Sequence, residues 1–120
     1  MINKPLGKQI QHREKNDCTV DALAIALEID YLQAYGYLLG HGRKYGKGFV
    51  VEPVYDNLEG VKKFAKPNMT VGRFISEVAC FGNWIIKIQG HAFAVKNGVI
   101  FDIRPEGNIN RHVICAWRVK

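Results

Sequence analysis

The pattern of hydrophobic and polar positions divides the chain into a first half with helical spacing and a second half of short strands. A polar start, residues 16–19, leads into residues 20–29, which are apolar almost all the way round. A helix with this pattern lies inside a domain, with protein on several sides. We predict this central helix over residues 17–28. Asn16 or Asp17 can cap it, because a short side-chain oxygen accepts an N–H group of the first turn.

Two further segments show helical spacing. Asp30 is expected to cap a helix that begins at Tyr31 and stops at Gly40 or Gly42, and the very short joint before it predicts that the first two helices pack as a pair. Thr70 is expected to cap another helix over residues 71–80. Between them, we predict a short helix around residues 54–58 and a short strand around residues 61–64.

Strands dominate from residue 83 onward. β-Branched and aromatic residues concentrate in residues 84–89, 91–96, 99–104 and 113–119, which are the predicted strands. Asn97-Gly98 between the second and third of these is the strongest short signal for a hairpin. Helices followed by an antiparallel sheet predict an α+β fold.

The predicted hairpin brings two functional side chains together. With Asn97 and Gly98 as the loop, the pairing places His91 and Asp102 as diagonal neighbours on one face of the sheet. A carboxylate in that position can orient an imidazole and stabilise its protonated form. A one-residue change in the turn would put the two side chains on opposite faces.

Cys18 stands in the first turn of the predicted central helix. The positive end of a helix dipole favours a thiolate, so Cys18 is a candidate nucleophile. Each residue also has a structural interpretation. Cys18 could be a small buried hydrophobe, and His91 a hydrogen-bonded residue of a strand. Asp102 could pair with Arg104, which the same register places opposite His91, or close the turn at the strand end.

Composition narrows the class of protein. At 120 residues, 48% of them apolar, the chain is expected to form a single domain over residues 1–120. The net charge of +6 favours acidic partners, but the basic residues are spread along the chain rather than densely patterned as in a dedicated nucleic-acid binder. The sequence shows neither a signal peptide nor a membrane span, which predicts a cytoplasmic protein with no membrane partner.

The cysteines and histidines favour neither disulfides nor metal. Cys18, Cys80 and Cys115 are odd in number and widely spaced, so they do not form a disulfide framework. Cys80 and Cys115 are predicted to be core residues. No CxxC or HxxxH spacing supports a zinc site, and we expect no metal and no cofactor.

Residues 17–27, Gly90-His91-Ala92 and the hairpin ending at Asp102 together resemble the papain-like cysteine peptidase superfamily, in particular its small bacterial and phage-type members. The resemblance covers residues 11–119. It implies a central helix that presents Cys18 as nucleophile and a strand that presents His91 as general base and acid. Asp102 would be the orienting residue.

The resemblance also implies an oxyanion site made by the Cys18 backbone N–H and one side-chain donor. The usual donor is a glutamine six residues before the cysteine, and this chain has His12 there. Gln11, one residue further away, is the favoured replacement, and Gln9 and Asn16 are alternatives.

Two arginines and one region are expected to affect substrate choice. Arg43 stands in a glycine-rich basic loop and would favour an acidic substrate if that loop borders the cleft. Arg104, opposite His91, could clamp an acidic group. Selectivity is expected to come from residues 40–68.

The leading functional hypothesis is a cysteine hydrolase of peptidase or isopeptidase type that acts on a protein or peptide. The same triad could instead catalyse deamidation or acyl transfer. A third hypothesis is a catalytically silent basic module that binds a host protein or, with weaker support, nucleic acid. The sequence does not specify an oligomeric state.

Overall fold

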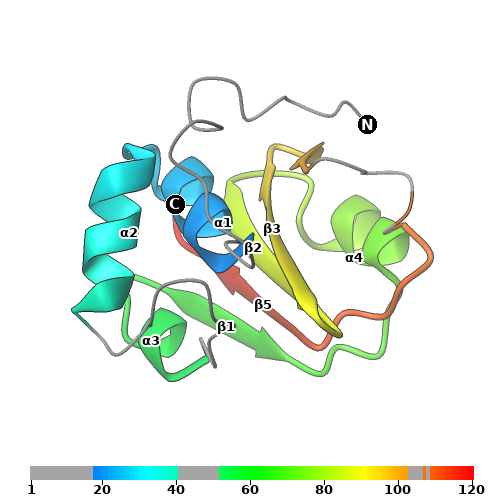
Figure 1. The fold of residues 1–120 in the computed structure, drawn as a ribbon. Helices are drawn as coiled ribbons and strands as arrows, with labels where there is room; N and C mark the ends of the chain where they lie inside the picture. The colour runs from blue at the N-terminus through cyan, green and yellow to red at the C-terminus, as the bar shows by residue number, and fades with distance from the viewer. Residues whose placement is uncertain (1–17, 41–51, 103–106, 108) are drawn as a thin grey trace.

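A five-stranded sheet forms the centre of the molecule (Figure 1). The computed structural model describes residues 18–40, 52–102, 107 and 109–120. Neighbouring strands are antiparallel and follow the order β1-β5-β2-β3-β4. The strands are β1 (Lys62–Ala65), β2 (Asn83–Ile88), β3 (His91–Lys96), β4 (Val99–Phe101) and β5 (Cys115–Arg118).

Helices cover both faces of the sheet, so the predicted α+β class is confirmed. The helices α1 (Cys18–Leu27), α2 (Tyr31–Leu39) and α3 (Glu52–Asp56) share one hydrophobic cluster with Ala92 and Ala94 of β3. The helix α4 (Val71–Glu77) belongs to a second cluster with Phe93 and Val95. Successive residues of a strand point to opposite faces, so these two clusters lie on the two sides of the sheet.

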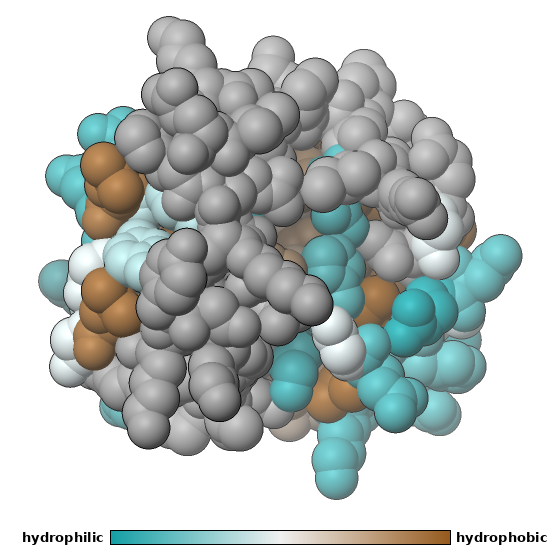
Figure 2. Space-filling view, in the orientation of Figure 1, coloured by the Kyte–Doolittle hydropathy of each residue, from teal (hydrophilic) through white to brown (hydrophobic). Residues whose placement is uncertain are grey.

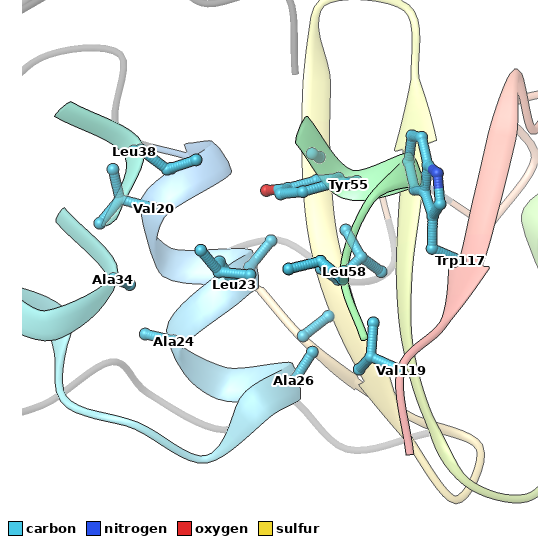
Figure 3. Packing of buried hydrophobic residues seen from close by; sticks show 14 of the residues in the cluster. Val20, Leu23, Ala24, Ala26, Ala34, Leu38, Tyr55, Leu58, Trp117 and Val119 are labelled. Carbon is cyan, nitrogen blue, oxygen red and sulfur yellow. The ribbon is translucent and has the colours of Figure 1, made fainter. Parts of the chain in front are cut away.

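The helix α1 is enclosed as its sequence predicts. Val20, Leu23 and Ala26 are buried, with α2 on one side of the helix and the sheet on the other (Figure 3). The small side chains of Ala92 and Ala94 on the facing strand let α1 approach the sheet closely. Because α1 starts at Cys18, this packing fixes where that thiol is presented.

The start of α1 is also attached to α3. The Tyr55 hydroxyl donates a hydrogen bond to the Thr19 backbone oxygen over 2.6 Å. The Tyr55 ring meets the buried Trp117 ring edge-on, with 5.0 Å between the centroids. The Trp117 indole N–H in turn donates to Asp56 Oδ1 over 2.8 Å. This chain of contacts ties the first turn of α1 to the sheet through α3.

The helix α2 begins and ends as predicted. Its N-cap is Asp30, whose backbone N–H donates to the Gln33 side chain over 3.0 Å, and its C-cap is Gly40. Apolar side chains lie on the side of the molecule that α2 forms, where Leu32 and Leu39 are exposed (Figure 2). Exposed apolar residues of this kind are common on globular proteins.

Several other boundaries differ from the prediction. The helix α3 starts two residues earlier than expected and β1 one residue later, at residues 52 and 62. The predicted strand over residues 113–119 is shorter, Cys115–Arg118. Thr70 caps α4 as predicted, since its hydroxyl accepts from the Arg73 N–H over 3.3 Å.

The end of α4 corrects the assignment of Cys80. The helix ends at Glu77, because the N–H groups of Val78 and Ala79 both donate to the Phe74 carbonyl and close the last turn. Ala79 takes the buried position and Cys80 is exposed. The prediction that Cys80 is a core residue is therefore wrong, whereas Cys115 is buried as predicted.

The β3–β4 hairpin has the predicted turn. Asn97 and Gly98 both have positive φ, 49° and 82°, as a type I′ turn requires. Lys96 pairs with Val99, which is the predicted register. The Asn97 side-chain oxygen accepts from the Gly82 N–H, and the Asn97 N–H donates to the Gly82 carbonyl, both over 2.9 Å. These two bonds fix the turn to the residue that precedes β2.

Among the described residues, no helix has the length and apolar character that crossing a membrane would need.

We predict that Asn97→Ala lowers the free energy of unfolding by about 1–2 kcal/mol, because alanine disfavours positive φ and cannot accept from Gly82. Asn97→Gly loses the same hydrogen bond but tolerates the backbone conformation, so it should be less destabilised. Urea unfolding of the three proteins measures the difference. Equal stability of the alanine and glycine variants would show that the turn does not need positive φ at this position.

Candidate active site

His91 is the first residue of β3 and directly follows the turn from β2. Ile88 pairs with His91, so Gln89 and Gly90 form a two-residue turn in which Gly90 has a φ of 76°. The imidazole lies on the sheet face that also carries Phe93, with the two ring centroids 5.9 Å apart. It is half-buried, with 32% of the side chain exposed.

Asp102 meets His91 as the hairpin register predicts. The distance between Asp102 Oδ2 and His91 Nε2 is 2.7 Å, and the carboxylate is 10% exposed. The predicted strand over residues 99–104 is too long, because β4 ends at Phe101 and Asp102 already lies in a bend. The side chains nevertheless make the contact. The turn chemistry and the alternation of side chains were sufficient to locate this pair.

Cys18 approaches the same imidazole from α1. Its side chain is partly buried and within hydrogen-bonding reach of His91. Because Asp102 engages Nε2, the ring nitrogen left for Cys18 is Nδ1. Three side chains, from the start of α1, the start of β3 and the bend after β4, thus meet at one place.

The neighbours of His91 favour its charged form. The pKa of His91 is raised to about 10. The largest cause is the hydrogen bond with Asp102, and the next is the hydrogen bond with the Cys18 side chain. Burial acts in the opposite direction and is outweighed. At neutral pH, therefore, the site holds an imidazolium between a carboxylate and a thiol, which is the charge arrangement that favours a thiolate.

Four residues of the predicted site lie outside the described residues. They are Gln11, Asn16, Arg43 and Arg104. The proposed donor of the oxyanion site, the cap of α1 and the pairing of Asp102 with Arg104 therefore stay predictions. The site that the structure describes consists of the cysteine, the histidine and the aspartate.

Arg111 is a neighbour of the site that the sequence analysis missed. Its Nη2 donates to the backbone oxygen of Gln89 over 2.9 Å, in the turn that leads into His91. The two residues are 22 positions apart, and Arg111 belongs to no regular element. Neither periodicity nor a motif could have connected them.

The described residues contain no group of three or more histidine, cysteine, aspartate or glutamate side chains arranged to hold a metal ion. Two of the four histidines, His12 and His41, lie outside those residues.

Comparisons of the chain with protein-family models, with curated proteins and with solved structures found no match. What the site does must therefore be inferred from its own geometry.

The raised pKa of His91 predicts how stability depends on pH. The imidazole has a pKa of about 10 in the folded protein and an ordinary pKa of 6.5. Its contribution to stability is therefore complete below pH 6.5 and is lost as the pH rises through 10. The difference in free energy of unfolding between the native protein and His91→Gln should therefore be largest at low pH and shrink from neutral to alkaline pH. Urea unfolding across this range measures it. His112→Gln, at an exposed histidine outside the triad, is the control for the loss of a histidine. A difference for His91→Gln that grows toward alkaline pH would contradict the assignment.

Removing the charge of Asp102 should lower the pKa of His91. In Asp102→Asn the largest cause of the upward shift is lost, so the pKa should fall from about 10 toward 6.5. The imidazole Cε1 proton, followed by NMR as a function of pH, reports it. Asp56→Asn removes a carboxylate that pairs with Lys63 instead, and should leave His91 unchanged. A His91 pKa that stays near 10 in Asp102→Asn would show that the carboxylate is not its main partner.

Proposed function

We propose that this protein is a cysteine hydrolase of the papain-like type, in which Cys18 is the nucleophile, His91 the general base and acid, and Asp102 the orienting residue. The observation that carries the proposal is the imidazole of His91, which is hydrogen-bonded to Asp102 at 2.7 Å and contacts Cys18. In covalent catalysis the nucleophile typically lies next to a general base, and a third group orients that base.

The arrangement of the elements supports the papain-like assignment. Cys18 begins an enclosed helix, and His91 begins a strand of the antiparallel sheet that packs against this helix. The positive end of α1 and the imidazolium both favour negative charge on the sulfur. The resemblance of residues 17–27 and of the hairpin to the papain-like superfamily points to the same three side chains.

The chemistry that follows is acyl transfer through a thioester. The Cys18 thiolate attacks a carbonyl carbon, and an S–C bond forms while the carbonyl oxygen takes the negative charge. The first N–H groups of a helix have no partner within it, so the Cys18 N–H is available to that oxygen. As the tetrahedral intermediate collapses, the C–N bond breaks and His91 gives its proton to the leaving amine.

Water completes the cycle. His91, now neutral, takes a proton from a water molecule, whose oxygen attacks the thioester carbon. The S–C bond breaks and a carboxylic acid leaves. His91 is then protonated again and Cys18 is again a thiolate. Asp102 keeps the ring oriented through both steps and stabilises its charged form.

The substrate that we propose is a protein or peptide amide. Deamidation differs only in that ammonia leaves from a side-chain amide, and acyl transfer differs only in that an amine replaces water. The described cysteines are free thiols, which suits a reducing compartment such as the cytoplasm.

Incubation with a complex peptide mixture in water labelled with ¹⁸O tests this proposal and separates the three reactions. Hydrolysis creates new carboxyl termini that carry one ¹⁸O atom. Deamidation puts ¹⁸O into a side-chain carboxylate without cleavage, and transfer to an amine creates a new amide without label. We expect labelled new termini from the native protein, measured by mass spectrometry.

Two variants make the result specific to the site. Cys18→Ala should abolish the products, because no thioester can form. Cys80→Ala removes a thiol that is exposed and away from the triad, so it should leave the products unchanged. Products that persist in Cys18→Ala would overturn the proposal.

A further inference from the structure

The guanidinium of Arg111 lies beside the residues that lead into the site. Its Nη2 donates to the Gln89 oxygen, and Gln89 is two residues before His91. One residue spans at most about 3.6 Å of chain, so the guanidinium is within about 10 Å of the His91 backbone. The hydrogen bond uses one of the five N–H groups that an arginine carries.

The segment that carries Arg111 is firmly attached. The Arg111 carbonyl accepts from the Val71 N–H over 2.8 Å, at the start of α4. Ile109 packs so closely on Gly72 that a Cβ there would lie 2.8 Å from its side chain. The Ile114 N–H donates to the Lys87 carbonyl over 2.8 Å. This part of the chain passes along α4 to the end of the sheet where β2 and β3 meet (Figure 1).

The positive charge of Arg111 is available to a ligand. The side chain belongs to an exposed residue, and none of the described carboxylates pairs with it. The position where a Gly90 side chain would be has no neighbouring atom within 4 Å, so the space next to the turn is open. The carboxylate of the described site, that of Asp102, is hydrogen-bonded to His91.

We propose that Arg111 determines specificity by favouring substrates with an acidic group next to the bond that is attacked. This inference rests on the proposed function, since it names the substrate class of the same site. A fixed guanidinium with free N–H groups attracts a carboxylate and can hydrogen-bond it. It also attracts any anionic reagent that approaches Cys18, and the attraction weakens with salt.

Two alkylating reagents that differ in charge test this directly. Iodoacetate is an anion and iodoacetamide is neutral. Both form an S–C bond at a thiolate while a C–I bond breaks and iodide leaves. Intact and peptide mass spectrometry gives the rate of each reagent at Cys18 and at Cys80 in the same molecule, and Cys80 is the exposed internal reference.

Three substitutions separate charge from support of the turn. Arg111→Gln removes the charge and keeps an N–H donor for Gln89, whereas Arg111→Lys keeps the charge. Arg118→Gln lowers the net charge equally at an arginine that packs against Gly82 instead.

At low ionic strength we expect the ratio of iodoacetate to iodoacetamide rates at Cys18, relative to Cys80, to fall about two- to fivefold in Arg111→Gln. The ratio should be retained in Arg111→Lys, and the difference between the native protein and Arg111→Gln should shrink at about 0.5 M salt. Arg118 lies against Gly82, two residues from Cys80, so Arg118→Gln should lower the iodoacetate to iodoacetamide ratio at Cys80 and leave the ratio at Cys18 itself unchanged. An unchanged ratio in Arg111→Gln overturns the inference. If both rates fall together and the ratio stays the same, Arg111 only positions the turn before His91. Failure of the proposed function has a different signature. If iodoacetamide modified Cys18 slowly and independently of His91, Cys18 would not be an activated nucleophile, whatever the ratio of the two rates.

Discussion

The hydrogen bond between His91 and Asp102 is the interaction on which the candidate site depends. It joins residues at the start of β3 and just after β4, so it forms only while the hairpin keeps its register. The register in turn depends on two residues with positive φ, Asn97 and Gly98, at the far end of the same hairpin. A slip of one residue would turn Asp102 to the opposite face of the sheet. Local backbone geometry at a tight turn thus controls the charge of an imidazole at the other end of the strands.

The rest of the fold brings the thiol to this pair. The alanines of β3 leave room for α1, and the contacts of α1 with α2, with α3 and with the sheet enclose it. Tyr55 holds the backbone of Thr19, the residue next to Cys18, and is itself packed on Trp117. On the other side of the sheet, α4 and the segment before β5 support the turn that leads into His91 through Arg111. Both faces of the sheet therefore contribute to the geometry of one site.

The sequence was sufficient where a local pattern determines the structure. Asn97-Gly98 predicts the hairpin, and from it the contact of His91 with Asp102, because turn type and side-chain alternation leave one register. The enclosed helix α1 follows from an apolar surface with few charges. Gln33, Asp30 and Thr70 define helix starts through hydrogen bonds that span three residues.

Features that depend on distant contacts could not be predicted in this way. The place of β1 at the sheet edge depends on its pairing with β5, which joins residues from Ala65↔Cys115 to Lys62↔Arg118, at least 50 positions apart. The sequence predicts Cys80 as a core residue within a helix over residues 71–80, whereas α4 closes its last turn on Phe74 and ends at Glu77. The hydrogen bond of Arg111 to the Gln89 backbone oxygen comes from an irregular segment, where neither spacing nor residue type indicates a partner.

The pH dependence of Cys18 alkylation by iodoacetamide tests most directly whether the site holds a thiolate and an imidazolium. Ordinary cysteine thiols titrate at about pH 8.5 and react slowly below neutrality. Cys80, an exposed thiol outside the triad, is the internal comparison within the same molecule. We predict fast modification of Cys18 at about pH 6, much faster than that of Cys80, and loss of this advantage in His91→Gln. Modification of Cys18 that follows the profile of Cys80 and does not change in His91→Gln would contradict the account.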